Sequence, residues 1–455
     1  MCKFNTENCL DCAAPKCVNS NLGYLKGTLM KKTDRILVYI AFLLILTVSA
    51  FSHELPVVEP EAVGLSTERL ARIDKMMEKH IAQQKIAGGV ILIARYGKIA
   101  YLGAHGMMDV EAEKPMAPDT MFRIASMTKQ ITSAAIMMLY EEGHFLLHEP
   151  VSKFIPAFKE MHVLPPEDAE DSASAVPATR QITIWNLLTH TSGLTYHWNE
   201  RLGPLYNDAG ITHGLLQDES TLAEKMKVLA TIPLLHQPGE KVEYGLSIDV
   251  LGYLVEVVSG MPLDQFFAER IFKPLGMTDT HFFIPEAKRE RMATVYERTG
   301  DGPIMRKSKE PTVQGSVIYS TDYPYNGPQT YFSGGAGLVS TAPDYVRFAQ
   351  MILNNGELDG VRLLSRKTVE LMTTHQLDEM GVDYGVGFGF GIALGKSNLK
   401  QLGSVGTYSG GGFFYTSFFI DPQEQMIGIF MAQLHPGAGA LAERIRILSY
   451  QAITD

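Results

Sequence analysis

A serine and a lysine three positions apart are the first residues of this chain that could do chemistry together. Ser126 and Lys129 stand at the expected start of a helix, and residues at i and i+3 share one helix face. A serine hydroxyl becomes a useful nucleophile when a base within hydrogen-bond reach takes its proton, and a buried lysine can be such a base. The spacing therefore supplies a nucleophile and a candidate base.

The segment after this pair is expected to be a buried helix, because residues 131–139 are apolar except for Thr132 and Ser133. An amine at the head of a buried helix is costly unless it is used. A Ser-x-x-Lys spacing also arises by chance, and an exposed pair is usually only a helix cap and a solvated amine. The pair therefore needs support from other parts of the chain.

Other catalytic patterns are missing or incomplete. The chain has no Gly-x-Ser-x-Gly, so the nucleophile elbow of α/β-hydrolases is absent. Residues 391–397 look like a phosphate loop, but three residues separate the glycines where four are required, so we interpret them as strand and turn. His144 and His148 lack the glutamate of a zinc-protease helix. We expect no metal and no cofactor.

Three further segments have a structural interpretation when each is taken alone. His190 is expected at a helix end, where a histidine more often holds a loop than does chemistry. The glycine run 334–337 could cradle an anion, but a tight turn before a helix is simpler. Tyr244 stands just before an apolar helix, at a loop-to-helix junction where a phenol can project into a cleft.

The first 52 residues are expected to be a leader and not part of the fold. A basic stretch, 30–35, precedes the uncharged segment 36–51, which is typical of a secretory signal peptide that begins at Met30. An uncleaved anchor is the alternative, although the segment is shorter than the roughly 20 residues of a spanning helix. Residues 1–29 are then an over-extended start. We expect a periplasmic or secreted protein, membrane-anchored only if the segment stays uncleaved.

Composition excludes further classes of function. All four cysteines, at positions 2, 9, 12 and 17, lie upstream of Met30, so the remaining chain has neither disulfides nor a cysteine nucleophile. The formal net charge is −10, and such an acidic surface argues against nucleic-acid binding.

The order of the expected elements predicts two lobes. Strand patterns lie at both ends and helical patterns between them, which indicates an α/β lobe from 53–120 and 335–455, interrupted by a helical lobe over 121–334. The expected strands are 89–97, 98–103, 384–394, 413–420 and 426–432, and the expected helices are 67–84, 183–190, 221–230, 248–259, 262–272, 344–354, 366–375 and 438–454. The longest polar loop is 165–177.

Several ordered segments resemble the serine β-lactamase and penicillin-binding-protein superfamily, and most of all the class C β-lactamase-like branch that includes the family VIII carboxylesterases. They are 122–129, 187–194, 242–252, 334–341 and a late glycine run before an aromatic strand that ends at 420–422. The resemblance covers about 60–450. It implies a β-lactamase/transpeptidase-like fold, an antiparallel sheet flanked by helices with an inserted helical lobe and the active site at the interface.

The resemblance also implies residue roles. Ser126 would be the acylated nucleophile and Lys129 its neighbouring base, while Tyr244 would share a proton with the lysine and protonate the leaving group. The backbone N–H groups of Ser126 and Phe413 would form the oxyanion hole.

Two positions depart from the family pattern. Leu246 and Ser247 stand where an asparagine is frequent. The glycine run 410–412 replaces Lys-Thr-Gly or Trp-Gly-Gly, so the side chain that would bind the carboxylate of penicillins and D-Ala-D-Ala peptides is missing. We expect a wider, less polar pocket, with Ser409 included if the alignment shifts by one residue. The expected pocket residues are Tyr408, Ser409, Gly410, Gly411 and Gly412.

The sequence therefore predicts a serine hydrolase that works through an acyl-enzyme, most simply a carboxylesterase for small or medium acyl esters. A β-lactamase or D-amino-acid peptidase, an acyltransferase, and a catalytically inactive binding relative are the alternatives. The expected partner is a small-molecule ester or amide substrate, and the sequence does not indicate an oligomeric state. The loops 195–220 and 300–332 are expected to set the acyl-chain preference.

Overall fold

An antiparallel sheet carries the fold of this protein, whose computed structural model describes residues 54–166, 174–298, 304–306, 312–314, 317–395 and 402–455. In this described part of the chain the sheet has eight strands in the order β14-β15-β16-β17-β18-β1-β2-β3. At its centre β1 pairs with β18, so Val90 lies opposite Met431 and early and late parts of the chain meet. The strands are β1 (Gly88–Arg95), β2 (Lys98–Asp109), β3 (Lys114–Pro115), β14 (Gly385–Val386), β15 (Gly391–Ile392), β16 (Tyr408–Gly412), β17 (Thr416–Asp421) and β18 (Met426–Met431).

Strand β1 is buried on both faces of the sheet. Its residues alternate between two hydrophobic clusters, with Val90 and Leu92 in one and Ile91 and Ile93 in the other. A continuous apolar run therefore forms this strand, because each side chain has a core to enter whichever way it points.

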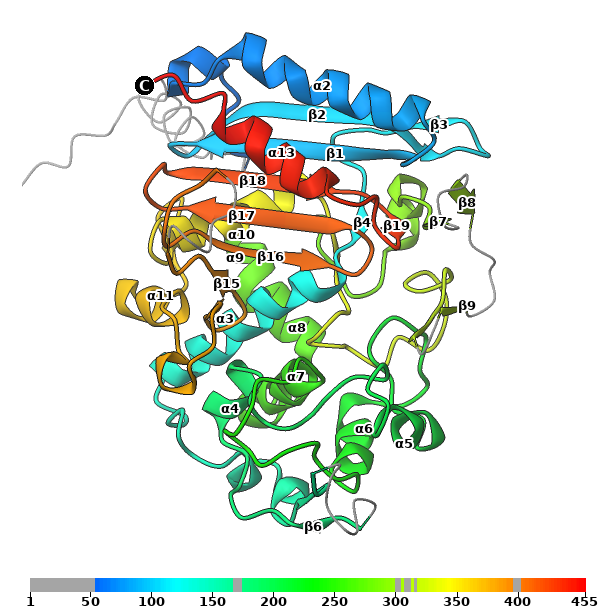
Figure 1. Ribbon diagram of the computed structural model, residues 1–455, viewed down its shortest axis with the longest axis vertical. Helices are drawn as coiled ribbons and strands as arrows, with labels where there is room; N and C mark the ends of the chain where they lie inside the picture. The colour runs from blue at the N-terminus through cyan, green and yellow to red at the C-terminus, as the bar shows by residue number, and fades with distance from the viewer. Residues whose placement is uncertain (1–53, 167–173, 299–303, 307–311, 315–316, 396–401) are drawn as a thin grey trace, which may run out of the picture. The chain divides into compact units, whose positions relative to one another are not determined.

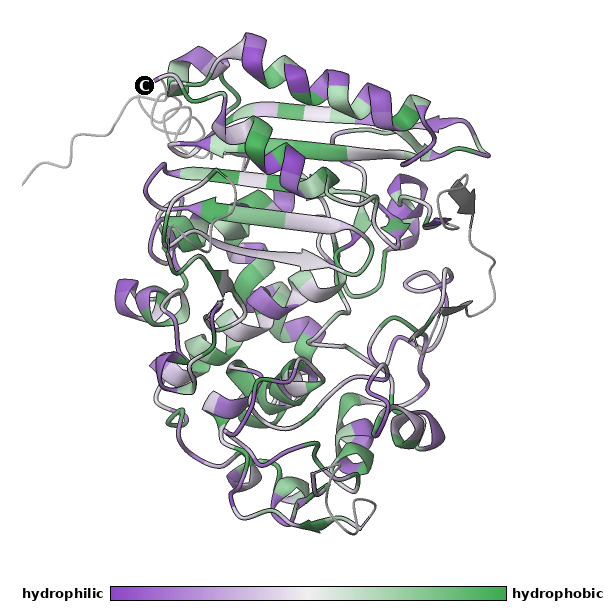
Figure 2. Cartoon of the chain, viewed as in Figure 1, coloured by the Kyte–Doolittle hydropathy of each residue, from purple (hydrophilic) through white to green (hydrophobic). Residues whose placement is uncertain are grey.

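Helices cover both faces of the sheet. Helices α2 (Thr67–Ala82) and α13 (Leu441–Tyr450) lie on one face (Figure 1), while α10 (Ala342–Leu353) packs against β1, β17 and β18. Leu70 and Ile73 of α2 join the cluster that contains Ile91, and hydrophilic bands alternate with hydrophobic ones along this helix in Figure 2. The predicted antiparallel sheet flanked by helices is confirmed.

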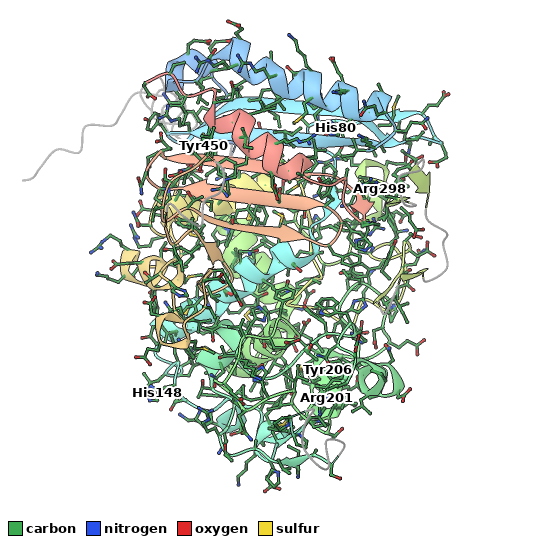
Figure 3. The ribbon with its side chains drawn as sticks, viewed as in Figure 1. His80, His148, Arg201, Tyr206, Arg298 and Tyr450 are labelled. Atoms are coloured by element: carbon green, nitrogen blue, oxygen red, sulfur yellow. The ribbon has the colours of Figure 1, made fainter. Side chains whose placement is uncertain are left out.

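Helix α3 (Thr128–Glu141) is the buried helix of the helical part, and its residues 128–139 are all buried. It packs against α7 (Ser247–Ser259), which begins after Leu246 and is followed by Gly260 in the left-handed conformation. Tyr206, labelled in Figure 3, is fully buried in this helical part. Within the described ranges the remaining α-helices are α4 (Ile184–Leu188), α5 (Gly203–Asp208), α6 (Leu222–Leu229), α8 (Leu263–Phe267), α9 (Lys273–Leu275) and α11 (Arg366–Met372).

Two strand predictions need correction. The segment 384–394 is two short paired strands, β14 and β15, and not one strand, because Gly387 and Gly389 turn the chain and the Gly387 N–H donates to Phe390 O at 2.8 Å. The strand expected over 413–420 begins at Thr416 instead, since Phe413 and the next two residues form the turn between β16 and β17.

The structure does not test several predictions made from the sequence. Residues 1–52, with the expected leader, lie outside the described residues, as does most of the loop 165–177. The division into lobes at 121 and 335 stays a prediction. Among the described residues, no helix combines the length and the apolar character that crossing a membrane requires.

Candidate active site

Ser126 lies between a short strand and the buried helix α3. Strand β4 (Phe122–Arg123) pairs with β11 (Val339–Ser340), and the 3-10 helix Ala125–Met127 follows directly. Ala125 has φ +42°, a left-handed conformation that is rare for a residue with a side chain. The strained residue before the serine places Ser126 at the wall of a cavity of about 460 Å³.

The three predicted catalytic side chains meet in this cavity. The Tyr244 hydroxyl donates to Ser126 Oγ at 2.7 Å, and Lys129 Nζ donates to the same oxygen at 3.2 Å. Lys129 Nζ also lies 4.7 Å from the centre of the Tyr244 ring. One hydroxyl is thus in contact with two groups that can exchange a proton with it.

Lys129 is held by two further acceptors. Its Nζ donates to Gly335 O at 2.8 Å and to Tyr196 Oη at 3.1 Å. Together with Ser126 Oγ these make three acceptors, which match the three N–H bonds of an ammonium group. The predicted turn over 334–337 is present, and it has a function in the site because it supplies one of these acceptors.

A fully buried carboxylate, Asp249, lies behind Lys129. Its Oδ1 accepts from Ser333 Oγ at 2.5 Å and from the Gly335 N–H at 3.3 Å. Burial raises the pKa of this carboxyl, while the Ser333 hydrogen bond and the charge of Lys129 oppose that shift. Asp249 therefore fixes the turn that holds the lysine and places a carboxyl group near the lysine's positive charge.

Aromatic rings surround the Tyr244 phenol. The ring centroids of His190, Tyr196 and Trp198 lie 4.8, 5.4 and 6.4 Å from that of Tyr244. Burial, with the nearby charge of Lys129, lowers the pKa of His190 to about 3, so this imidazole is neutral at ordinary pH. The backbone of His190 holds a neighbouring segment, since its carbonyl accepts from the Glu243 N–H at 2.7 Å.

The predicted pocket residues are not all on the cavity wall. Ser409, Gly410 and Gly411 line it. Tyr408 is buried instead, with its ring centroid 5.6 Å from that of Phe390. Gly412 lies under the segment that leads to Ser126, where a Cβ would come within 2.2 Å of Ile124 O.

Phe413 lies in the hairpin turn after Gly412. Its ring stacks on His435 with a centroid distance of 3.7 Å, and its carbonyl lies 3.1 Å from His435 Nδ1. The oxyanion-hole roles of the Phe413 and Ser126 N–H groups stay predictions.

Leu246 and Ser247, which stand where an asparagine is frequent in the family, have structural roles here. Leu246 is fully buried, and Ser247 Oγ lies 2.8 Å from Ser192 Oγ. Neither is among the described residues that line the cavity. An amide contact from this segment to a substrate is therefore missing.

Sequence reasoning did not identify Tyr196, Asp249 or Gly335 as parts of the site. Asp249 had a visible signal, because it is an acidic residue between the apolar residues Ile248 and Val250 at the start of an expected helix. Tyr196 follows the segment 187–194 by two positions, which placed it near the site without showing its contact with Lys129. Gly335 contributes a carbonyl, which any residue type carries.

Known proteins that are similar to this chain point to one family. Residues 73–452 match the model of the family described as Beta-lactamase. Protein Rv1367c of Mycobacterium tuberculosis is 36% identical over 77% of this chain and 86% of its own length. Esterase EstB of Burkholderia gladioli is 34% identical over 80% of this chain and 90% of its own length. The solved structure of EstCE1, a hydrolase with promiscuous acyltransferase activity, is similar with a TM-score of 0.73 at 29% identity, over 84% of this chain and 99% of that one.

Proposed function

Because this chain belongs to the β-lactamase family of serine hydrolases, we propose that it is a carboxylesterase that forms an acyl-enzyme on Ser126. The observation that carries the proposal is the convergence of Tyr244 Oη and Lys129 Nζ on Ser126 Oγ, at 2.7 and 3.2 Å. The proposed substrates are small or medium acyl esters.

The proposed reaction moves one proton between three groups. The Tyr244 hydroxyl passes its proton to Lys129 and takes the proton of Ser126 in its place, while Oγ attacks the ester carbonyl carbon. The carbonyl oxygen becomes the oxyanion and accepts backbone N–H donors, which we propose are those of Ser126 and Phe413. When the C–O bond breaks, Tyr244 returns the proton to the departing alcohol. Water then attacks the acyl carbon and gives a proton to Tyr244. When the bond between this carbon and Ser126 Oγ breaks, Tyr244 passes that proton to Oγ and the acid is released.

The cavity favours esters over β-lactams and D-alanyl peptides, which carry a carboxylate. Lys129 is the one cation among the described residues that line it, and its N–H groups already have three acceptors. His190 is neutral and gives no positive charge to an anion. A substrate carboxylate would thus lose water without gaining an ionic partner.

Acyl transfer to an alcohol is a second candidate, which the similarity to EstCE1 favours. It uses the same acyl-enzyme, and an alcohol replaces water in the second step. Adding 1-butanol to an ester assay and measuring butyl ester against free acid separates the two outcomes.

One assay tests the proposed function. Purified protein is incubated with p-nitrophenyl butyrate, nitrocefin and a D-Ala-D-Ala peptide, with Ser126→Ala as the control. We expect turnover of the ester that is lost in Ser126→Ala. Nitrocefin turnover far above ester turnover would overturn the substrate choice, and ester turnover that survives in Ser126→Ala would overturn the mechanism.

Export from the cytoplasm is part of the proposal, supported by the basic and uncharged segments 30–51. Sequencing the N-terminus of the protein made in its own cells tests this. A start near residue 53 is the expected result, and a start at Met1 would contradict it.

A further inference from the structure

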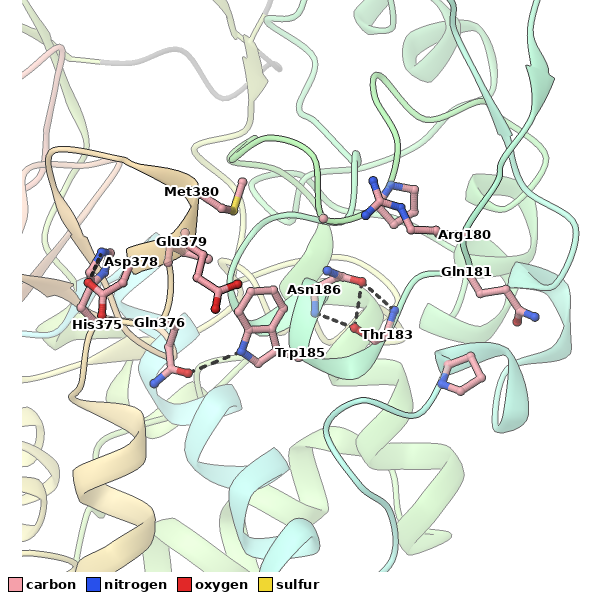
Figure 4. A pocket seen from close by; sticks show the side chains of 14 residues that line it. Arg180, Gln181, Thr183, Trp185, Asn186, His375, Gln376, Asp378, Glu379 and Met380 are labelled. Carbon is pink, nitrogen blue, oxygen red and sulfur yellow. Dashed lines mark hydrogen bonds and ion pairs between the residues drawn. The ribbon is translucent and has the colours of Figure 1, made fainter.

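A second and larger cavity, of about 890 Å³, lies beside the one that contains Ser126. Figure 4 shows it from close by, with Trp185 near its middle, Glu379 and Met380 on one side of the indole and Arg180 on the other. A cavity of this size can hold a drug-sized organic group. The reaction proposed above uses none of these side chains.

Hydrogen bonds fix the wall that Trp185 forms. The indole Nε1–H donates to Gln376 Oε1 at 3.4 Å, and the amide nitrogen of Gln376 donates to Leu371 O at 2.8 Å. At the start of α4, Thr183 and Asn186 form a capping box, with the Asn186 N–H donating to Thr183 Oγ1 at 3.1 Å. The indole is thus a pre-positioned flat surface, on which a ring can stack without first ordering the protein.

Two opposite charges in this cavity have no partner. Arg180 and Glu379 are both exposed, and neither has a hydrogen bond or ion pair with any residue that the structure describes. Because they stand on opposite sides of Trp185, they define a direction along the cavity, from a carboxylate to a guanidinium. Asp378, paired with His375 at 3.5 Å, adds a second carboxylate at the Glu379 end.

No described residue lines both cavities, but two segments of the chain contribute to the wall of each. In the first segment, residues 238–239 line the larger cavity, and Val242 and Tyr244 line the smaller one. In the second segment, residues 375–380 line the larger cavity, and residues 384–387 and 389–391 line the smaller one. Backbone bonds tie these segments to the site, since the Gly239 N–H donates to Thr191 O and the Gln376 N–H to Val386 O. The walls of the two cavities are therefore neighbours along these two segments.

We propose that the larger cavity is the distal subsite of the ester site and binds the remote end of an elongated substrate. That end is a flat ring stacked on Trp185, with a cationic amine toward Glu379 and an anionic group toward Arg180. The proposal rests on the proposed ester function for its link to Ser126, but the ring site itself can be tested without catalysis.

The chain has only two tryptophans, which makes a direct binding test possible. In Trp198→Phe, Trp185 is the single source of indole fluorescence. This variant is titrated with 4-(aminomethyl)benzoate, which carries both charges, and with benzylamine and 4-methylbenzoate, which carry one each. We expect saturable quenching, tightest for the dipolar probe.

Charge variants then assign the two ends. Glu379→Gln should weaken the binding of the dipolar probe and of benzylamine about two- to fivefold and leave the binding of 4-methylbenzoate unchanged. Arg180→Gln should weaken the binding of the dipolar probe and of 4-methylbenzoate by a similar factor and leave benzylamine unchanged. The factors are small because each exposed ion pair contributes little. Glu370→Gln and Arg366→Gln are matched controls, because they make the same changes in the exposed pair on α11. No saturable quenching, or equal losses in the control variants, would overturn the dipolar site.

Kinetics test the link to Ser126. A p-nitrophenyl hexanoate whose chain end carries the aminomethylbenzoate ring is compared with p-nitrophenyl butyrate. In Trp185→Ala the ratio of kcat/KM for the long ester over the short one should fall about five- to tenfold, because a ring stack is lost. An unchanged ratio would overturn the subsite. If wild type hydrolyses neither ester while Trp185 is still quenched, the proposed function fails and the dipolar site stands.

Discussion

Replacing Gly335 with alanine tests whether the geometry around Lys129 limits the reaction. Gly335 O accepts from Lys129 Nζ at 2.8 Å, and the Gly335 N–H donates to Asp249. A Cβ at this position would lie 2.4 Å from Asp249 Oδ2 and 3.3 Å from Tyr196 Oη. Both neighbours belong to the group that fixes the lysine.

The expected losses of kcat and stability in Gly335→Ala follow from the lack of space for the added Cβ. Ordinary contacts of a Cβ begin at 3.4 Å, so Asp249 and residue 335 must separate by about 1.0 Å, the difference between 3.4 and 2.4 Å. A shift of 1 Å in a positioning group can lower the rate about 10²-fold. Overpacking in such a buried place should also lower the free energy of unfolding by about 1–3 kcal/mol.

The assay measures kcat for p-nitrophenyl butyrate together with the thermal midpoint. Gly391→Ala is the comparison variant, because it adds the same methyl group at the same cavity with no atom nearer than 3.7 Å. We expect kcat to fall about 10²-fold in Gly335→Ala and far less in Gly391→Ala. Equal kcat values in the two variants would refute the reasoning.

Three further substitutions probe single contacts. Tyr196→Phe removes one acceptor of the Lys129 ammonium and should lower kcat by about tenfold. The pH optimum should not move, because burial holds the pKa of Tyr196 well above its usual value. A shifted optimum would show that this phenol titrates in the reaction. Asp249→Asn can keep both hydrogen bonds to Oδ1, so we expect a clear loss of kcat with a small change in the thermal midpoint, and an unchanged kcat would exclude a role for its charge. Asp344 is a stability test: burial raises its pKa to about 6, so its carboxyl binds a proton more tightly in the folded state. Stability should therefore fall as the pH rises from 3.8 to about 6, and wild type should lose about 2 kcal/mol over this range relative to Asp344→Asn in urea unfolding; parallel curves for the two proteins would contradict this.

The sequence predicted the elements whose side chains repeat with a clear period. Helix α2 was found from Leu70, Ile73 and Met77, and strand β1 from a continuous apolar run. The late strands were placed less well, because glycines such as Gly389 turn the chain with a positive φ, and the hydrophobic period of the sequence does not show such a turn. The segment after Gly412 looked like a strand since aromatic residues also fill turns that pack on a core.

The site divides in the same way. Ser126, Lys129 and Tyr244 belong to recognisable motifs, and the structure brings them together. Tyr196 enters through a contact between residues 67 positions apart, and Gly335 through a backbone carbonyl 206 positions from Lys129. Neither kind of contact leaves a local pattern in one sequence.

The larger cavity beside the site was beyond sequence reasoning for a related reason. Its walls come from α4 and from the segment 375–380, which lie about 190 positions apart, as the bond between Trp185 and Gln376 shows. No single segment carries a motif for it. It became visible only when the fold placed an indole and two unpaired charges around one volume.

The most direct test of the central claim is the mass of the protein after reaction with a p-nitrophenyl alkylphosphonate. We predict one adduct per chain, located on Ser126 by peptide mass spectrometry, absent in Ser126→Ala and formed much more slowly in Lys129→Ala and Tyr244→Phe. An adduct on another residue, or one that forms equally fast without Lys129 and Tyr244, would contradict the account.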